Sequence, residues 1–219
     1  MTPVTSSTLT TRNVSTSREL ALLISGASGM VLAARFAELA LEHGNLDALH
    51  LVITPPATQV LKLELGAGWA SAPKFHDRLR ASYDGQTRIR TWSNEDLGAP
   101  ISSGSHVLIG TVILPCSAGT AGAVAHGISR GLLQRAADVA LKQRWPLILG
   151  IRESPMSEIL LENLLRLART GATIMPPLPA FYLKPDPQNA LEEFIDHYCL
   201  RILDLLGIHL ERKELRWKS

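Results

Sequence analysis

The chain has 219 residues, a charged fraction of 19% and a formal net charge of +2 at pH 7. This length and composition are typical of a protein with one continuous hydrophobic core. Basic residues are interspersed with acidic ones and form no stripe with aromatic residues, which excludes a nucleic-acid platform. No apolar run reaches the ~20 residues of a membrane helix. Two cysteines, Cys116 and Cys199, provide no disulfide framework, so we expect a reducing, cytoplasmic compartment.

Residues 1–18 are rich in Ser and Thr, contain no acidic residue and lack the apolar segment of a secretory signal. We expect a disordered N-terminal arm. The composition is also compatible with an organellar transit peptide, but two arginines without an amphipathic pattern give that alternative little support. A single domain is expected over residues 19–208, followed by a C-terminal tail over residues 209–219.

Within this domain, apolar runs alternate with helical patterns. Strands are expected in ELALLIS, DALHLVIT, GTVILP, PLILGI and ATIM, and RIRTW is a candidate short strand. Helices are expected over about residues 29–43, 57–65, 119–144 with a break near Gly131, 156–169 and 190–206. Strands that are apolar throughout are typical of a parallel sheet covered on both faces, so the pattern predicts an α/β fold. Residues 66–93 are expected to form a loop or an irregular helix.

Small or polar residues follow each predicted strand. In an open parallel sheet the ligand crevice lies at the carboxyl ends of the strands, so we expect these residues to converge on one site. They are Ser25 to Gly29, Thr54 to Pro56, Pro115 to Thr120, Arg152 to Ser154, and Pro176 to Pro177 leading toward Tyr182.

The first of these segments, SGASG, follows a strand and opens a helix. Its backbone N–H groups and the Ser28 hydroxyl suit an anionic group at the positive end of the helix. A tight turn without a ligand explains the same residues. The third glycine of a dinucleotide fingerprint is absent, which argues against NAD.

The segment PCSAGTAG, residues 115–122, repeats this design after a later strand. Ser117, Gly119 and Thr120 are small enough for a planar ring or a phosphate to approach the backbone. Ser117 is also suited to capping the helix. Cys116 has no identifiable base beside it, so we interpret it as a packed residue rather than a nucleophile.

Charged residues end the strand in WPLILGIRESP, residues 145–155. Charges at a buried strand end need partners, and an anion beside Arg152 would supply one. A structural ion pair between Arg152 and Glu153 is the alternative. Ser154 and Pro155 are expected to cap the next helix and to begin it.

The preceding helical stretch, QRAADVALKQR, contains Arg135 and Lys142. These cations are seven residues apart and therefore lie on one face of the helix. Taken alone, this pattern indicates a solvated face.

Several stretches in this order resemble the UbiX family of flavin prenyltransferases, formerly described as aromatic-acid decarboxylases. They are GASG, PCS with its glycine- and threonine-bearing turn, LLQRAADVALKQR, RESP, LENLLRL and GATIMPPLPAFY. The likeness runs from about residue 20 to residue 206 and is densest over residues 110–182. It implies a three-layer sandwich, flavodoxin-like or Rossmann-like, with a parallel sheet and helices on both faces. It also implies FMN binding and assembly as trimers packed into a homododecamer, with the site at subunit junctions.

The resemblance implies a reaction as well. The family joins a dimethylallyl unit from dimethylallyl phosphate to N5 and C6 of reduced FMN, and the prenylated FMN serves UbiD-type decarboxylases. The sequence has no Asp-rich metal motif, so we expect fixed cations to stabilise the departing phosphate without metal. Two alternatives remain. A flavin-dependent Cys decarboxylase would need a histidine near the first helix start, where none precedes His43, and an FMN carrier would need no second phosphate site.

Carried over residue by residue, the resemblance implies three groups of site residues. FMN contacts are expected from Gly26, Ala27, Ser28, Thr54, Ser117, Ala118, Gly119, Thr120 and Arg152. Dimethylallyl phosphate contacts are expected from Arg135, Lys142, Arg152, Tyr182 and Arg201. Glu153 and Glu64 resemble the family's acid–base carboxylates, and Lys142 and Tyr182 are counted with them as catalytic.

The sequence departs from the family pattern in three places. Thr54-Pro55-Pro56-Ala57 replaces the usual Ser-Lys-Ala-Ala, so a hydroxyl is kept and a lysine is lost. SGSH replaces SGSF, and His106 at this position either tunes the flavin or reflects a change in packing. Residues 66–93 are longer than usual, which would alter the entrance to the site.

Overall fold

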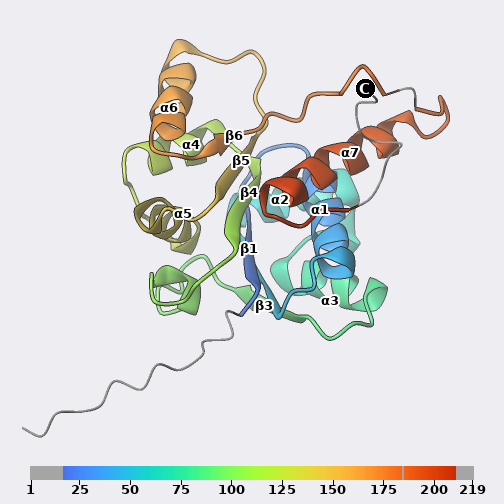
Figure 1. Ribbon diagram of the computed structural model, residues 1–219, viewed down its shortest axis with the longest axis horizontal. Coiled ribbons are helices and arrows are strands. Elements are labelled where there is room, and N and C mark those ends of the chain that lie inside the picture. The colour runs from blue at the N-terminus through green and yellow to red at the C-terminus, as the bar shows by residue number, and fades with distance from the viewer. Residues whose placement is uncertain (1–16, 184, 211–219) are drawn as a thin grey trace, which may run out of the picture.

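The computed structural model describes residues 17–183 and 185–210, which form a six-stranded sheet (Figure 1). The strand order is β3-β2-β1-β4-β5-β6, and every neighbouring pair is parallel. The strands are β1 (Glu19–Ile24), β2 (Ala48–Ile53), β3 (Arg88–Trp92), β4 (Gly110–Cys116), β5 (Leu147–Ile151) and β6 (Thr173–Ile174). Because β1, β2, β4 and β5 are buried along their whole length, their residues are apolar at nearly every position.

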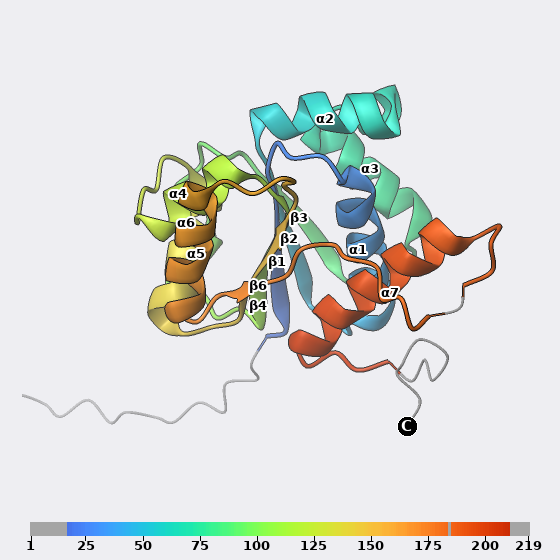
Figure 2. The ribbon, with the colours of Figure 1, turned by 90° about the horizontal axis from the view of Figure 1, so that it is seen from above.

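Helices cover both faces of the sheet, so the fold has three layers (Figure 2). One layer contains α1 (Met30–His43), α2 (Pro55–Leu65), α3 (Ala72–Ser82) and α7 (Ala190–Leu205), with the short turn η1 (Ala67–Trp69). The other contains α4 (Ala118–Ala125), α5 (Leu132–Gln143), α6 (Glu158–Arg169) and the turn η2 (Pro100–Ser102). Each layer has its own buried core against the sheet. The flavodoxin-like, Rossmann-like three-layer sandwich is therefore confirmed.

The strand order reverses between β1 and β4. The chain continues from β1 to β2 and β3 on one side, then returns through β4, β5 and β6 on the other. In open parallel sheets this switch point, at the carboxyl ends of the strands, forms the ligand crevice. The topology therefore favours the segments after β1 and β4 as the centre of a site.

The segment from residue 66 to residue 93 is more regular than its sequence indicates. The candidate strand RIRTW is confirmed as β3, but the expectation of a loop or irregular helix is wrong for α3. Only Phe75 and Leu79 of α3 are buried, so the helix has a weak apolar pattern. Ser71 caps it, its hydroxyl oxygen accepting from the backbone N–H of Lys74.

The prediction for the start of α6 is also wrong. The helix begins at Glu158, and Ser157 caps it by accepting a hydrogen bond from the backbone N–H of Leu160 at 3.2 Å. Ser154 and Pro155 instead lie in the segment between β5 and α6, joined by a cis peptide bond. This segment places Arg152 and Glu153 in a loop at the sheet edge.

The predicted N-terminal arm, residues 1–18, lies outside the described residues except for its last two positions. The predicted tail, residues 209–219, lies outside them except for its first two. Along the described part of the chain, no helix is long and apolar enough to cross a membrane.

Candidate functional site

The segments after β1, β4 and β5 meet at the carboxyl edge of the sheet. Ser25 joins the first two, because its Oγ donates to the carbonyl of Pro115 at 2.9 Å and accepts from the N–H of Ser117 at 2.8 Å. The N–H of Arg152 donates to the carbonyl of Cys116 at 3.1 Å, which brings in β5. The predicted convergence of these strand ends is confirmed.

A carboxylate of the protein itself caps the start of α1. Glu64, at the end of α2, accepts hydrogen bonds from the N–H of Gly29 at 3.0 and 3.2 Å and from that of Met30 at 2.7 Å. Gly29 has a φ of +100°, which favours glycine. Ala27 is buried and Ser28 half-buried in the turn before it. The anion expected at this helix end is therefore Glu64, and a ligand has to approach the turn beside it.

The start of α4 faces open space. Ser117 caps this helix, as expected, since its Oγ accepts from the N–H of Thr120 at 3.2 Å and donates to the Thr120 hydroxyl at 3.0 Å. A Cβ built on Gly119 would meet no atom within 4 Å, and Ala118 beside it is half-buried. Cys116 is fully buried, and burial raises the pKa of its thiol, as expected of a packed residue.

Thr54 and the prolines after it pack against the first turn. The Thr54 hydroxyl donates to the carbonyl of Ile24 at 3.2 Å, so it joins β2 to β1. A Cβ on Gly26 would lie 2.6 Å from the Cβ of Pro56, closer than real Cβ atoms approach one another. Gly26 therefore has to be a glycine here, and because the contact is with a Cβ, the alanine of the family pattern would require the same.

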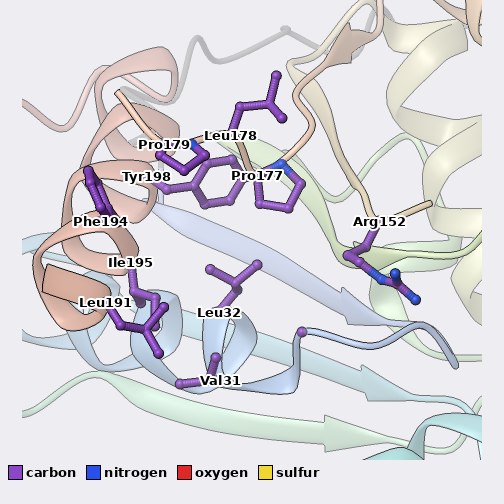
Figure 3. A pocket seen from close by; sticks show the side chains of 11 residues that line it. Val31, Leu32, Arg152, Pro177, Leu178, Pro179, Leu191, Phe194, Ile195 and Tyr198 are labelled. Carbon is purple, nitrogen blue, oxygen red and sulfur yellow. The ribbon is translucent and has the colours of Figure 1, made fainter. Parts of the chain in front are cut away.

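An apolar cavity of about 260 Å³ lies beside this edge, between α1 and α7. Figure 3 shows Arg152 on one side of it, with Phe194 and Leu191 of α7 on the opposite side and Pro177 and Tyr198 between them. The Nε of Arg152 is buried and has no hydrogen-bond partner among the described residues. A buried guanidinium N–H without an acceptor is costly, so an anion or carbonyl placed here would be stabilised.

Glu153 follows Arg152 and is half-buried. Its Oε1 accepts a hydrogen bond from the N–H of Ser154 at 3.3 Å. No ion pair joins it to Arg152 within the described ranges, so the alternative of a structural Arg152–Glu153 pair is not supported.

Tyr182 and Arg201 belong to a second cluster, joined by a histidine that the sequence analysis missed. The Tyr182 hydroxyl lies 3.0 Å from Nε2 of His197 in α7. Arg201 lies one helical turn after His197 and pairs with Asp204 at 3.0 Å. Neither Tyr182 nor Arg201 lines the cavity beside Arg152. The four-residue spacing from His197 to Arg201, which places both on one helix face, was the available signal.

Arg135 and Lys142 lie away from Arg152 within one copy of the chain. Arg152 directly follows β5, whereas Lys142 precedes it, and a strand of this length spans roughly 16 Å. Arg135 lies in the layer on the other side of the sheet from the cavity, where its Nε donates to the carbonyl of Ser102 at 3.1 Å and its guanidinium pairs with Asp138. A single copy therefore does not gather all the expected phosphate ligands.

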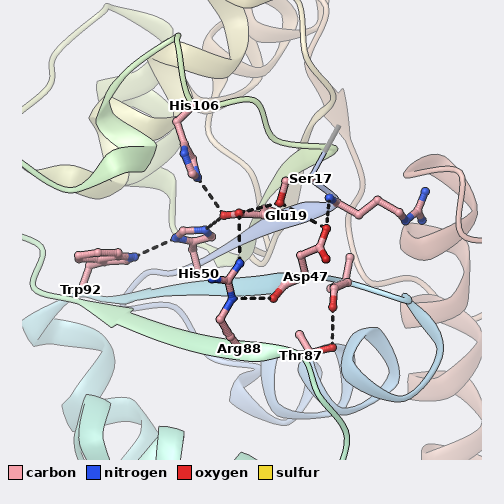
Figure 4. A network of polar contacts seen from close by, with 10 residues as sticks. Ser17, Glu19, Asp47, His50, Thr87, Arg88, Trp92 and His106 are labelled. Carbon is pink, nitrogen blue, oxygen red and sulfur yellow. Dashed lines mark hydrogen bonds and ion pairs between the residues drawn. The ribbon is translucent and has the colours of Figure 1, made fainter. Parts of the chain in front are cut away.

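A buried polar network occupies the opposite edge of the sheet (Figure 4). Glu19 at the start of β1 lies 2.6 Å from Nε2 of His50 and 2.9 Å from Nε2 of His106, and it accepts from the Ser17 hydroxyl at 2.8 Å. Burial acts to raise the pKa of Glu19, but hydrogen bonds from His50 and Ser17 outweigh it and lower that pKa to about 2. Burial also lowers the pKa of His50.

The ligand atoms of Glu19, His50 and His106 lie within 4.8 Å of one another, a spacing also found in metal sites. The indole N–H of Trp92, however, donates to Nδ1 of His50 at 3.0 Å. An indole only donates, so the proton of His50 sits on Nε2 and points at Glu19. A metal ion on Nε2 would move that proton to Nδ1 and break the Trp92 bond. We therefore interpret the cluster as a hydrogen-bond network, and His106 as part of it.

Comparison with known proteins identifies the family. The chain matches the family described as Flavoprotein over residues 8–196. It is 37% identical to flavin prenyltransferase UbiX of Methanocaldococcus jannaschii over 190 residues, which is 87% of this chain and 94% of that one. It is 38% identical to the enzyme of the same name from Pseudomonas aeruginosa over 191 residues, 86% of this chain and 89% of the relative.

Solved structures agree with this relationship. A dodecameric FMN-dependent UbiX-like decarboxylase from Escherichia coli O157:H7 has a TM-score of 0.78 at 33% identity, over 92% of this chain and all of that one (100%). AnUbiX, solved with FMN and dimethylallyl pyrophosphate, has a TM-score of 0.75 at 35% identity, over 93% and 98% of the two chains. The Cys decarboxylase TvaF shares the fold alone, at 17% identity. This chain therefore belongs to the flavoprotein family and, within it, to the UbiX flavin prenyltransferases.

Proposed function

We propose that this protein transfers the dimethylallyl group of dimethylallyl phosphate to N5 and C6 of reduced FMN and releases phosphate. The product, prenylated FMN, is made for a UbiD-type decarboxylase. A single FMN-binding domain, residues 19–208, performs the reaction. The proposal is supported by relatives named flavin prenyltransferase and by AnUbiX, which was solved with FMN and dimethylallyl pyrophosphate.

The buried Nε of Arg152 is the observation that carries this proposal. It lies at the carboxyl edge of the sheet, after the strand next to β4, and beside an apolar cavity. FMN combines an anionic phosphate with a flat, largely apolar ring, and the residues at this edge fit both parts. The open end of α4 at Gly119 suits an anion, and Arg152 with the apolar cavity suits a ring that carries carbonyl acceptors. When bound, reduced FMN supplies the electron-rich ring atoms that accept the allyl group.

The donor phosphate must be stabilised as it leaves, because negative charge collects on it. We assign this task to Arg152, Lys142, Tyr182 and Arg201, with Arg135, like Lys142, coming from a neighbouring copy. Fixed cations and a phenol match the charge of a monophosphate. This assignment makes the reaction independent of metal ions.

Two carboxylates handle protons. Glu153, beside Arg152 at the end of β5, relays a proton to or from the phosphate. Glu64 lies at the start of α1, where Gly29 and Met30 hold its carboxylate. It accepts the proton that leaves C6 of the flavin.

Lys142 acts in the site of a neighbouring copy. Because Lys142 precedes β5 and Arg152 follows it, one copy does not bring the two together. We propose a homododecamer, as in the Escherichia coli relative, with exposed apolar residues such as Leu178 and Phe181 in its contacts. The two buried free cysteines, Cys116 and Cys199, support a cytoplasmic location.

Anaerobic incubation with reduced FMN and dimethylallyl phosphate, without divalent metal, tests the proposal. Mass spectrometry of the extracted flavin is expected to show one added five-carbon unit. Glu153→Gln should abolish this gain, while Glu162→Gln, a change of an exposed glutamate in α6, should preserve it. FMN that binds tightly but keeps its mass, with dimethylallyl diphosphate also tested, would instead establish a flavin carrier.

A further inference from the structure

His197 in α7 contacts one side chain assigned to the donor phosphate and lies beside another. Its Nε2 is 3.0 Å from the Tyr182 hydroxyl, and the two rings meet edge to face at 84°. Arg201 follows one turn later on the same helix face. His197 is 8% exposed, whereas Tyr182 is 42% exposed and the Arg201 side chain 51%. A buried imidazole therefore contacts an exposed phenol and lies one helical turn before an exposed cation.

The surroundings of His197 favour its neutral ring. Burial lowers its pKa, the positive charge of Arg201 lowers it further, and Asp204 acts in the opposite direction. A neutral imidazole has one N–H and one acceptor nitrogen, so its contact with Tyr182 has two forms. In one, the phenol donates to Nε2; in the other, Nε2–H donates to the phenol oxygen.

Only the second form prepares Tyr182 for a phosphate. The hydroxyl of a phenol has a single hydrogen to donate. If it donates that hydrogen to His197, only the lone pairs of its oxygen face the phosphate, and they repel the phosphate oxygens. If His197 donates instead, the phenol hydrogen is not used by His197 and can be donated to an anion that reaches it, and a hydrogen bond to a charged oxygen is among the stronger ones. The role assigned to Tyr182 therefore requires the Nε2–H tautomer of His197.

We propose that His197 is a positioning residue for the prenyl donor. Its Nε2–H donates to the Tyr182 oxygen and turns the phenol hydrogen toward the phosphate of dimethylallyl phosphate, beside Arg201. The contact also joins the segment after β6 to α7, so it holds two phosphate ligands in a fixed relation. The identity of the anion rests on the proposed function, whereas the hydrogen-bond pair itself does not.

Three variants test this role: His197→Phe keeps an aromatic ring but loses the donor, His197→Gln keeps an N–H donor, and Tyr182→Phe removes the receiving hydroxyl. We expect His197→Phe to raise KM for dimethylallyl phosphate about 10-fold, with kcat changed less and FMN affinity unchanged. His197→Gln should recover most of the loss. The double variant His197→Phe with Tyr182→Phe should be no worse than Tyr182→Phe alone, because the two residues act through one contact.

Calorimetric titration of dimethylallyl phosphate into the FMN-loaded protein supplies a second readout that needs no turnover. Weaker binding in His197→Phe, recovered in His197→Gln, would support the inference even if the parent protein makes no prenylated FMN, an outcome that would defeat the proposed function alone. Equal binding by the parent and His197→Phe, with a normal melting temperature, would overturn it. So would equal defects in the Phe and Gln variants, because a purely packing role predicts no rescue.

Discussion

The carboxylate of Glu64, in α2, accepts hydrogen bonds from the backbone N–H groups of Gly29 and Met30, which open α1. Gly29 in turn lies against Arg152, since a Cβ built on it would be 3.7 Å from Cγ of that arginine. Glu64 and Arg152 therefore flank the same glycine. The carboxylate assigned to proton removal also stabilises the helix start beside the site.

Two substitutions separate these tasks. Glu64→Gln keeps an oxygen that accepts from the α1 N–H groups but removes the base, so we expect a nearly unchanged melting temperature and a strong loss of prenyl transfer. Glu64→Ala removes both and should also lower the free energy of unfolding by about 1 kcal/mol, the usual effect of losing a helix cap. Thermal unfolding and flavin mass spectrometry measure the two effects. Full transfer by Glu64→Gln would rule out Glu64 as the base.

The positions of the strand-end residues were predictable because a parallel sheet brings all its carboxyl ends to one edge. Ser117 and Arg152 each directly follow an apolar strand, so chain order alone placed them together. The sequence predicted the site at the start of α1 only in part. The positive helix end predicted an anion, but nothing in the local sequence indicated that Glu64, 35 residues after Gly29, supplies it.

The remaining gaps have physical causes. His50 and His197 lie in apolar patterns, where a histidine reads as a packed residue until its partner, Glu19 or Tyr182, is located in space. The helix α3 was missed because it buries only two side chains, Phe75 and Leu79, which leave a weak helical pattern in the sequence. Lys142 was assigned by family resemblance, although the strand predicted in PLILGI, now β5, already separated it from Arg152.

The buried carboxylate of Glu19 predicts a pH dependence of stability. Its pKa of about 2 lies below the ordinary value of 4.5, so the folded state binds the proton more weakly than the unfolded chain. The resulting stabilisation is fully present above pH 4.5 and is lost as the pH falls toward 2. The lowered pKa of His50 also makes the fold less stable as the pH falls below the ordinary pKa of a histidine. At such pH values the unfolded chain binds this proton more readily than the folded protein does.

Urea unfolding of the parent and Glu19→Gln between pH 2 and pH 7 measures this effect. At pH 7 the variant is expected to be less stable by on the order of 3 kcal/mol, and the difference should shrink as the pH approaches 2. Asp84→Asn, a change of an exposed carboxylate, should show little difference at any pH. A Glu19→Gln deficit that stays constant with pH would contradict the assigned network.

His106→Phe restores the aromatic residue of the family pattern and tests whether this histidine tunes the flavin. Because His106 bonds to Glu19 at the edge opposite Arg152, we expect a loss of stability of about 1–2 kcal/mol and no change in the flavin spectrum or turnover. His43→Phe is a matched control, since the His43 side chain is 26% exposed against 27% for His106. A shifted flavin spectrum in His106→Phe alone would assign it to the flavin instead.

The separation of Lys142 and Arg152 by the length of β5 predicts complementation between inactive copies. Lys142→Ala and Glu153→Gln should each abolish prenyl transfer when expressed alone. If Lys142 serves a neighbouring site, co-expression of the two variants gives mixed assemblies in which about a quarter of the sites hold both intact residues. Activity should then return to a comparable fraction, whereas a chain carrying both substitutions, co-expressed with either variant, should restore none. Native mass spectrometry verifies mixing, and mixed assemblies without activity would place Lys142 and Glu153 in the site of the same copy.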